Sequence, residues 1–513
     1  MKDLTITVKT LYGFEDILTE ELNELGYQDV EKSNRSVQLK GSWKDVYRLN
    51  YLCRLAIAVL VEIDRFHIHN ENDLYKKANK IDWPSFFDVD KSFSVKGAIF
   101  SKIFNHTNYP MLLVKDAIVD KFRDKVGDRP NVELKSPQVA IDVYISDKQV
   151  VISLNTSGVP LFQRGYRQQT GEAPMNEVLA AGLLRLSGWD KKSTLVDPMC
   201  ASGTIAIEAA LWAADIPAMI ERHHFAFRNF NSYDADIWAE VRKEGNNRPI
   251  DLGFPIIASD IDAGMVRKAQ RNARVAPIGK MITFNTSDFH DLEPPEETGT
   301  LIMNPPYGER MGDEVIEMYE EIGDTFKQKY AGYNCWVVSS NIDAIKRVGL
   351  KPNKKIKVFN GSLECSFRKF EVFKGSLKTD SSNTQENASK DDDRETKKKE
   401  PKEKRIDRYN RLKREKELES KVEEAPEVQE EKREEETAKK ETPKPEEKKE
   451  TSRGASKYAQ RNLKYTIADD SDKKEEQESR SSTSSDESKN KQQDDQSSFK
   501  EKIEKMKKYR KRD

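Results

Sequence analysis

Apolar and polar residues at the start of the chain switch between a two-residue period, typical of strands, and a helical period. The strand pattern occupies residues 4–8, 36–40 and 57–63, and the helical pattern occupies residues 14–25 and 42–52. Gly26 ends the first helical run, as glycine commonly does at the end of a helix. This order predicts a ferredoxin-like β-α-β-β-α-β domain over residues 1–65.

Residues 66–160 show the same two periods with a different spacing, which predicts a second α+β module. Its expected elements are a helix from about residue 72, a strand at 93–99, a helix at 112–122 and strands at 138–145 and 149–154. Only residues 146–148 separate the last two strands, so we expect these strands to form a hairpin.

Residues 161–375 contain short continuous apolar runs alternating with helical patterns, which is typical of parallel strands buried on both faces. The expected strands lie at 194–197, 255–260, 281–288, 301–303 and 334–339, and two of the helices at 265–276 and 315–329. A last hairpin over 355–373 turns at Asn360-Gly361. The fold class is therefore α/β, a Rossmann-like doubly wound sheet with a closing antiparallel hairpin. Residues 215–253 are less patterned, and we interpret them as an insertion that covers this sheet.

The composition changes near residue 376. From there to residue 513 the chain is mainly Lys, Glu, Asp, Ser, Gln and Asn, which predicts a disordered charged tail because such residues bury too little apolar surface to fold. Although 35% of all residues are charged, the net charge is −1, so charge alone gives no argument for nucleic-acid binding.

Other features of the composition exclude several classes of protein. The four cysteines have no paired spacing, which predicts reduced thiols and neither a disulfide framework nor a zinc site. The chain starts without a signal-peptide pattern and has no apolar run of membrane-spanning length, so we expect a cytoplasmic protein with no membrane partner.

The sequence Asn304-Pro305-Pro306-Tyr307 directly follows the apolar run at 301–303. Each proline fixes φ at about −65°, so the chain leaves the strand rigidly. A planar exocyclic amine can then donate one hydrogen to the Asn304 side-chain oxygen and another to the Pro305 carbonyl, while Tyr307 stacks on the ring that carries the amine. An ordinary Pro-Pro turn is the alternative, but the flanking Asn and Tyr favour an amine-binding site.

Earlier in the chain, the strand at 194–197 leads into a loop of small residues and the start of a helix. Such a loop brings backbone amides close to a bound nucleotide. The next two strands end in acids. We expect Asp260 to accept hydrogen bonds from both ribose hydroxyls, with Asp262 as the competing choice, and Asp288 to accept one from an adenine amine.

These motifs resemble those of class I S-adenosylmethionine-dependent amino-methyltransferases that act on nucleobases. The resemblance implies S-adenosylmethionine as the cofactor, Asn304 to Tyr307 as catalytic residues, and a cofactor pocket that includes Pro174, Asp197, Cys200, Ala201, Gly203 and Thr204. One position departs from the family, which has a glycine where this chain has Ala201. If that position is left-handed, alanine costs on the order of 1 kcal/mol, which bears on cofactor affinity and not on the fold.

Residues 66–160 resemble a THUMP domain, an RNA-binding module. Lys96, Lys102, His106 and Lys115 are the candidates for a phosphate-binding face of this module, and the alternative for each of them is an ordinary solvated surface charge. Arg164 and Arg167, in the Arg-Gly-Tyr-Arg run that follows this module, are expected to contact RNA as well.

Over residues 1–375 the chain is similar to bacterial THUMP-containing RNA N2-guanine methyltransferases that modify large-subunit ribosomal RNA. The resemblance implies methyl transfer to the exocyclic N2 amine of a guanine in structured RNA, most simply 23S ribosomal RNA. Three alternatives stay open: a transfer RNA guanine-N2 methyltransferase, a DNA adenine methyltransferase and a non-catalytic RNA-binding assembly factor. We also expect the catalytic domain, 161–375, to bind the cofactor normally without the first 160 residues.

Overall fold

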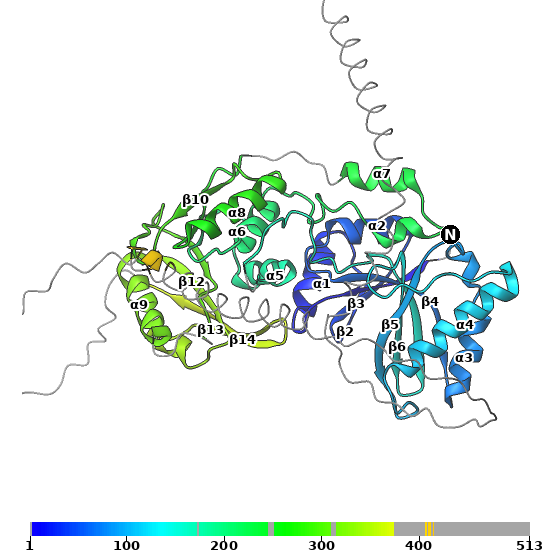
Figure 1. Ribbon diagram of the computed structural model, residues 1–513. Helices are drawn as coiled ribbons and strands as arrows, with labels where there is room; N and C mark the ends of the chain where they lie inside the picture. Colours follow the sequence, from blue (N-terminus) through cyan, green and yellow to red (C-terminus); the bar gives the residue numbers. More distant parts are fainter. Residues whose placement is uncertain are drawn as a thin grey trace, which may run out of the picture. The chain divides into compact units, whose positions relative to one another are not determined.

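The computed structural model describes residues 3–171, 174–244, 251–308 and 314–373, together with residues 406–407, 409–411 and 414. Two seven-stranded sheets organise this part of the chain (Figure 1). The predicted tail, 376–513, lies almost entirely outside the described residues. None of the helices within the described ranges is both long enough and apolar enough to span a bilayer.

The first sheet is built by residues 4–155. Its strands are β1 (Leu4–Lys9), β2 (Val30–Ser33), β3 (Ser36–Gly41), β4 (Ala58–His67), β5 (Phe93–Phe100), β6 (Val139–Ser146) and β7 (Gln149–Asn155). They lie in the order β2-β3-β1-β4-β7-β6-β5. The antiparallel group β2-β3-β1-β4, with helices α1 (Glu15–Glu24) and α2 (Trp43–Leu52), confirms the ferredoxin-like prediction. Strand β2 is mostly polar and exposed, so its sequence carried no strand signal.

The second module continues the same sheet. Strand β4 pairs antiparallel with β7, β7 pairs antiparallel with β6, and β6 pairs parallel with the edge strand β5. Helices α3 (Glu71–Lys80) and α4 (Tyr109–Val126) belong to this module, with a 3₁₀ turn η1 (Trp83–Ser85) between α3 and β5. The two predicted N-terminal modules are therefore joined by main-chain hydrogen bonds through one continuous sheet.

The second sheet confirms the predicted Rossmann-like domain. Its strands are β8 (Leu195–Asp197), β9 (Ile256–Asp260), β10 (Ile282–Thr286), β11 (Gly299–Met303), β12 (Tyr333–Ser339), β13 (Lys354–Asn360) and β14 (Leu363–Glu371), in the order β10-β9-β8-β11-β12-β14-β13. Pairing is parallel from β10 to β12 and antiparallel in the closing β13–β14 hairpin. Strand order reverses between β8 and β11, and ligands bind beyond the carboxyl ends of strands at such a switch point.

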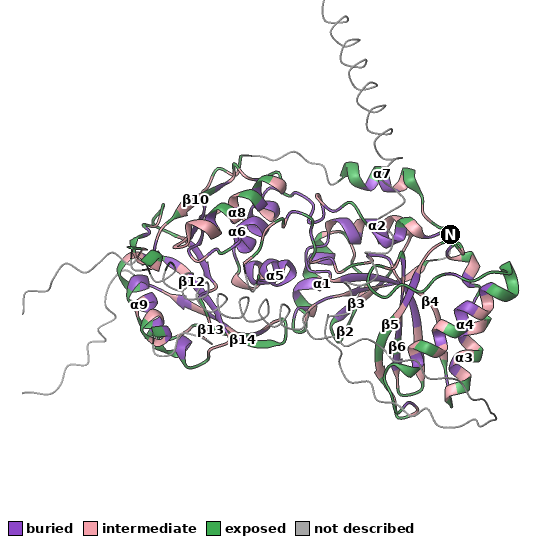
Figure 2. Ribbon diagram, in the orientation of Figure 1, coloured by how far each residue is buried: buried purple, intermediate pink, exposed green. Residues whose placement is uncertain are grey.

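The helices of the catalytic domain are α5 (Glu177–Ser187), α6 (Thr204–Ala213), α8 (Ala263–Val275) and α9 (Glu314–Lys329), with 3₁₀ turns η3 (Phe289–Asp291) and η4 (Ala344–Val348). Helix α6 is buried from Thr204 to Leu211, whereas α8 is amphipathic (Figure 2). A helix that is apolar nearly all round belongs in a core. The loop that precedes α6 is therefore attached to a helix in the core of the domain.

The expectation that residues 215–253 cover the catalytic sheet is wrong. This insertion forms η2 (Ala226–Asn229) and α7 (Ala235–Glu244), and α7 packs on α2 of the ferredoxin-like domain. Lys44 of α2 lies 2.7 Å from Glu240 of α7, and the rings of Tyr51 and Trp238 pack edge to face. The aromatic residues of the insertion therefore attach the catalytic domain to the N-terminal module.

Candidate active site

A cavity of about 140 Å³ lies where the chain leaves β8 and β11. Asp197 ends β8 and Asn304 follows β11, and both residues line the cavity. The rest of its wall comes from the segments before α5 and α6 and from the starts of α6 and α8: Gly171, Pro174, Met175, Met199, Cys200, Ala201, Ser202, Thr204, Ile205 and Met265. The structure therefore brings most of the predicted loop residues and the predicted catalytic asparagine into one pocket.

The loop between β8 and α6 is tightly turned. Ala201 has φ of 47° and Gly203 has φ of 84°, so both residues adopt the left-handed conformation. At Gly203 a glycine is required twice over, because an added Cβ would lie 2.9 Å from the Cβ of Ala269 on α8. The sequence predicted a conformational cost if Ala201 were left-handed. The structure shows that it is left-handed, so the loop accepts this cost.

Asp197 lines the cavity with a buried carboxyl group, and 1% of its surface is exposed. Among the described residues, neither side-chain oxygen has a hydrogen-bond partner of full geometry. Burial raises the pKa of Asp197 to about 8, and the nearby backbone N–H of Ala206 lowers it only in part. This side chain is suited to receive a cation or a strong donor from a ligand.

Asn304 is oriented by its own motif. The Tyr307 hydroxyl donates to the Asn304 side-chain oxygen at 2.8 Å, so the oxygen that we expect to accept from an amine is already fixed in position. Burial raises the pKa of Tyr307, which keeps the hydroxyl protonated and able to donate. A carboxamide oxygen has two lone pairs, so it can accept from Tyr307 and from a ligand together.

The turn after Asn304 is held by side chains that the sequence did not single out. The Asn341 amide donates to the Tyr307 carbonyl at 3.0 Å, and the Tyr319 hydroxyl reaches the Pro306 carbonyl at 3.4 Å. Ser339, at the end of β12, shares a 2.7 Å hydrogen bond with Tyr319. Because the two prolines leave the turn with few backbone donors, these side chains supply its hydrogen bonds.

The Asp260 carboxylate is part of the loop structure. One oxygen accepts from the backbone N–H of Ala201 at 2.9 Å, and the other accepts from the N–H of Asp262 at 2.9 Å. Asp262 caps α8 by accepting from the Gly264 N–H at 2.7 Å. Asp260 therefore holds the cofactor loop, whereas Asp262 caps α8. Asp260 is also the residue predicted from the sequence to bind the ribose.

Asp288, expected near an adenine ring, follows β10 and is largely buried. Its side chain accepts from the His290 N–H at 3.0 Å and caps the turn η3. Asp260 and Asp288 are not among the residues that line the 140 Å³ cavity, which covers the loop end of the site. Their contacts with a ribose and an adenine remain proposals.

The comparisons with known proteins agree with this architecture. Residues 164–369 match the family described as "RMKL-like, methyltransferase domain". Residues 69–155 match the THUMP domain, and residues 5–60 match the RlmL ferredoxin-like domain. A protein of Shewanella frigidimarina named ribosomal RNA large subunit methyltransferase K/L is 39% identical over 376 residues, which cover 72% of this chain and 53% of that protein. The chain thus spans about half the length of this relative.

Solved structures match over the same part. A possible methylase from Clostridium difficile is 30% identical with a TM-score of 0.65, and the match covers 73% of this chain and all of that one. The chain belongs to the RMKL-like methyltransferases. A Listeria monocytogenes structure described as an N6-adenine-specific DNA methylase is 28% identical with a TM-score of 0.65, covering 72% of this chain and 97% of that chain. Another relative of this fold, 27% identical with the same TM-score over 73% of this chain and all of the other, was solved with SAH bound.

S-adenosylmethionine is the cofactor of this class I methyltransferase, and the pocket fits it. The methionine part of the cofactor ends in an ammonium group, and the buried Asp197 carboxyl group has no hydrogen-bond partner of full geometry among the described residues. The left-handed loop that lines the pocket leads directly into the start of α6, and a helix start suits anionic or polar groups of a nucleoside ligand. When bound, the cofactor supplies a methyl group on a positively charged sulfur.

The expectation that Arg164 contacts RNA is corrected by the structure. Its side chain is completely buried, and its guanidinium lies 3.2 Å from Glu208 of α6. The Leu161 carbonyl also accepts from it at 3.0 Å. A guanidinium with these partners has no surface to offer to a phosphate.

Arg167 is likewise mostly buried, so its predicted RNA contact is also corrected. It pairs with Glu177 at 2.8 Å and donates to the Met175 carbonyl at 2.7 Å and the Thr204 hydroxyl at 3.0 Å. Pro174 lines the pocket as expected, and α5 begins three residues later at Glu177, where Asn176 caps it. Arg167 therefore acts on two pocket residues from within the protein.

The four predicted phosphate-binding residues come from consecutive segments of the THUMP domain. Lys96, on β5, and the loop residues Lys102 and His106 are exposed. Lys115 of α4 is half-buried and pairs with Asp116 at 2.7 Å, which offsets its charge. Their role in RNA binding remains a proposal, and it is weaker for Lys115 than for the other three.

Tyr409, from the predicted tail, contacts the residue that caps α8. The Tyr409 hydroxyl lies 3.4 Å from the Asp262 carboxylate, and burial together with Asp262 raises the pKa of Tyr409 to about 12. The described residues around it are helical (Figure 1). In the sequence, Tyr409 is a single tyrosine within a charged run. It therefore belongs to the predicted disordered charged tail.

Proposed function

We propose that this protein transfers a methyl group from S-adenosylmethionine to the exocyclic N2 amine of a guanine in large-subunit ribosomal RNA. The observation that carries the proposal is the fixed Asn304 carboxamide in the wall of a pocket that the buried Asp197 also lines. The amine of an unstacked guanine donates to the Asn304 oxygen and to the Pro305 carbonyl, and Tyr307 stacks on the base. These contacts aim the nitrogen lone pair at the methyl group.

Catalysis of this kind depends on positioning. The sulfonium is already a strong electrophile, so the protein has to align the amine and exclude water. The side chains that support the turn, Tyr319 and Asn341, keep the Asn304 segment in one conformation. This rigidity is what positioning catalysis requires.

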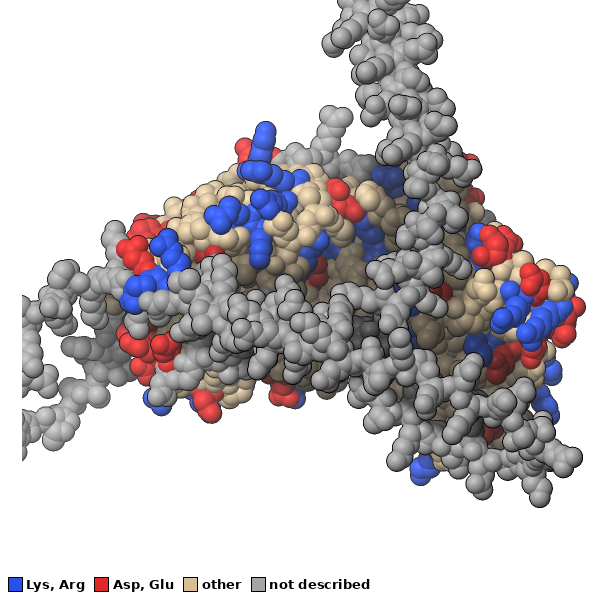
Figure 3. Space-filling model, in the orientation of Figure 1, with Lys and Arg blue, Asp and Glu red and all other residues tan. Residues whose placement is uncertain are grey.

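A basic helix beside the pocket supports a polyanionic substrate. Helix α8 begins at the pocket, where Met265 is a lining residue, and it carries Arg267, Lys268, Arg271 and Arg274 without an acidic residue between Ala263 and Val275. The three arginines are exposed, and Figure 3 shows Lys and Arg side chains gathered over α8. Within the described ranges no acidic side chain forms an ion pair with any of the four. Cations at this density neutralise phosphates next to the reacting base.

A DNA adenine methyltransferase is the second candidate, because the same motif holds the adenine N6 amine and a structure described as an N6-adenine-specific DNA methylase is similar to this chain. The match of residues 69–155 to the THUMP domain favours RNA. The transfer RNA enzyme and the non-catalytic assembly factor of the sequence analysis stay as lesser alternatives.

The experiment that tests the proposal offers the purified protein ribosomal RNA, transfer RNA and duplex DNA with methyl-labelled cofactor. We expect labelled N2-methylguanine in 23S ribosomal RNA and at least a hundredfold less label with Asn304→Ala. The Arg267→Gln/Arg271→Gln/Arg274→Gln variant should bind RNA more weakly. The slope of its binding constant against salt concentration should decrease by the amount that corresponds to about two to three lost phosphate contacts. Label in DNA adenine, or the absence of label from all three substrates, would overturn the proposal.

A further inference from the structure

Helix α6 carries the cofactor loop at its first turn, and polar side chains from outside the helix hold it along its length. Arg167 donates to Thr204 at the start of the helix, and Arg164 pairs with Glu208 in the middle. Arg54 reaches the far end. Arg54 belongs to the ferredoxin-like domain, so part of this support comes from outside the catalytic domain.

Arg54 caps the C-terminal end of α6. Its guanidinium donates to the Leu211 carbonyl at 3.1 Å and to the Ile216 carbonyl just beyond the helix. Backbone carbonyls at the end of a helix lack partners within the helix and carry a partial negative charge, so a cation there is favourable. Burial lowers the pKa of Arg54 to about 10, so it remains charged at neutral pH.

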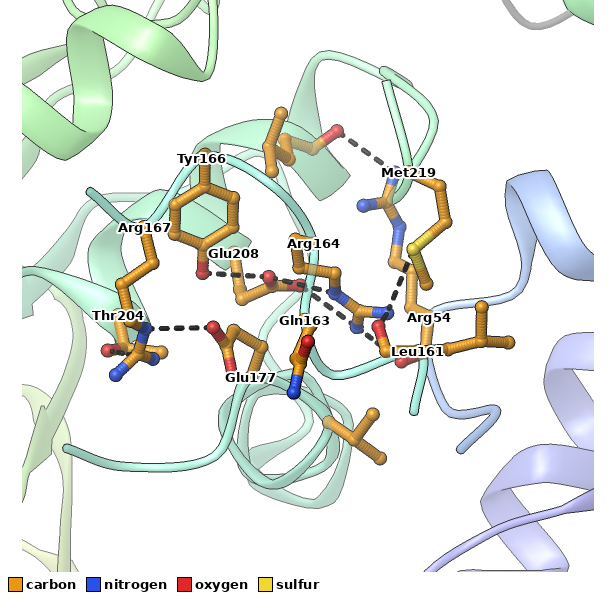
Figure 4. A network of polar contacts seen from close by, with 12 residues as sticks. Arg54, Leu161, Gln163, Arg164, Tyr166, Arg167, Glu177, Thr204, Glu208 and Met219 are labelled. Atoms are coloured by element: carbon orange, nitrogen blue, oxygen red, sulfur yellow. Dashed lines mark hydrogen bonds and ion pairs between the residues drawn. The ribbon is translucent and has the colours of Figure 1, made fainter. Parts of the chain in front are cut away.

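Arg164 joins Arg54 to the middle of the same helix. Its guanidinium donates to the backbone carbonyl of Arg54 at 2.5 Å while it pairs with Glu208, and the Tyr166 hydroxyl donates to Glu208 at 3.0 Å (Figure 4). Glu208 is fully buried. A buried carboxylate that loses its cation costs several kcal/mol, so this arrangement strongly fixes the position of α6.

The ferredoxin-like domain is itself held rigidly at this contact. Glu21 of α1 accepts from the backbone N–H groups of Arg54 and Leu55, each at 2.9 Å. The Phe14 ring lies so close to α5 that a Cβ on Gly182 would come within 2.0 Å of it. Arg54 is therefore presented to α6 by a segment with little freedom to move.

We propose that Arg54 is a positioning residue for S-adenosylmethionine, through which the ferredoxin-like domain completes the cofactor site. Arg54 fixes the C-terminal end of α6 and, through Arg164, the helix middle. The first turn of that helix, with Thr204 and the left-handed loop before it, then lies where the cofactor binds. The N-terminal module thus acts on the cofactor as well as on RNA.

The inference depends on the cofactor pocket and not on the identity of the methyl acceptor. It is tested by cofactor binding in the full-length protein, with no RNA present. A failure of the proposed guanine specificity would leave this measurement unchanged, so the two proposals fail separately.

The test compares Arg54→Met and Arg54→Lys with the wild-type protein by calorimetric titration of S-adenosylmethionine. We expect Arg54→Met to raise the dissociation constant about tenfold or more, and Arg54→Lys to restore part of the affinity because its ammonium still reaches a carbonyl. In steady-state transfer assays, KM for the cofactor should rise while kcat at saturating cofactor changes by less than about twofold.

A matched control separates positioning from general stability. Asn50 is also buried in the ferredoxin-like domain, but it bonds Val46, Thr156 and Ser157 and makes no hydrogen bond to α6. Asn50→Ala should lower the melting temperature and leave the cofactor dissociation constant within about twofold of wild type. The proposal is overturned if Arg54→Met and Arg54→Lys both bind the cofactor as tightly as wild type, or if Asn50→Ala weakens binding as much as Arg54→Met does. If Arg54→Met does not fold, Arg54→Lys decides the question against the same control.

Discussion

The Asp260 carboxylate accepts a hydrogen bond from the backbone N–H of Ala201 at 2.9 Å. An acid at the end of β9 thereby holds the loop that follows β8, in the conformation that gives Ala201 a φ of 47°. The predicted ribose-binding residue and the one unusual residue of the cofactor loop are thus a single structural unit. Changes at either residue are expected to affect cofactor binding.

For Asp260→Ala we predict a loss of roughly 1.5–3 kcal/mol in S-adenosylmethionine binding, because charge-assisted hydrogen bonds to the ribose and to the loop disappear together. Asp262→Ala is the control. It removes the cap of α8 and should cost about 1 kcal/mol of folding stability with little effect on binding. Calorimetry on both variants checks this, and a reversed order of effects means that Asp262 is the ribose acid.

For Ala201→Gly we predict a more stable protein, by about 0.5–1 kcal/mol. The left-handed conformation costs alanine about 1–2 kcal/mol, and the extra freedom of glycine in the unfolded chain removes part of the gain. Gly203→Ala is the mirror experiment and should destabilise, because its φ is 84° and its Cβ would press on Ala269. Denaturant unfolding of both variants gives the comparison. A loss of stability in Ala201→Gly would contradict this account of the loop.

For Asp197 we predict proton release when the cofactor binds. The pKa of Asp197 is about 8 in the folded protein, so at pH 7 the group is mostly protonated, and the ammonium of the cofactor lowers its pKa. Close to one proton should be released per cofactor at pH 7 and much less at pH 9. Titration calorimetry in two buffers of different ionisation enthalpy measures it, and Asp197→Asn should abolish the release.

The same group affects folding stability. Because the folded protein keeps the Asp197 proton up to about pH 8 and an unfolded aspartate releases it near 3.8, the folded state binds more protons in this window. The free energy of unfolding should therefore fall as the pH rises from about 4 to 8. Asp197→Asn should remove that part of the slope.

For Tyr307→Phe we predict a rate of transfer reduced by about tenfold, with cofactor affinity unchanged. The ring is kept for stacking, but the hydroxyl that fixes the Asn304 oxygen is lost. Tyr307→Ala removes both contributions and should be slower still. Single-turnover rates at saturating RNA and cofactor test this. Equal rates for Phe and Tyr would show that the hydroxyl does not position Asn304.

The fold and the centre of the site were predictable because their signals are local. The buried strands are short apolar runs, and Asn304-Pro305-Pro306-Tyr307 is contiguous, so its rigidity follows from the residues themselves. The strand and small-residue loop that contain Asp197, Ala201 and Thr204 are also one contiguous segment, and the family resemblance implied a cofactor pocket there. Parallel strands then bring these two segments to the same edge of the sheet.

The misassigned residues depend on contacts between distant segments. Arg164 and Arg167 were expected to contact RNA, but the sequence does not say that Glu208 and Glu177 meet them in the interior. The insertion was expected on the catalytic sheet, whereas its aromatic residues face α2. Arg54 is not part of any recognisable sequence motif. Its proposed role is visible only from its hydrogen bond to the end of α6 in the structure.

These contacts also change an expectation about truncation. The sequence suggested that the catalytic domain would bind cofactor normally by itself. Without residues 1–160, however, the end of α6 loses the Arg54 cap and Arg164 loses the carbonyl of Arg54. If Arg54 positions the cofactor loop as proposed, the isolated catalytic domain should bind the cofactor more weakly than the full-length protein.

The most direct measurement for the central claim is mass-spectrometric mapping of methylated guanines in total RNA from cells that have the protein, lack it, or carry only Asn304→Ala. The account predicts one N2-methylguanine in large-subunit ribosomal RNA that disappears without the protein, returns with the wild-type chain and stays absent with Asn304→Ala. Large-subunit RNA with the same guanine methylation in all three cells, or a mark lost instead from transfer RNA or from DNA adenine, would contradict it.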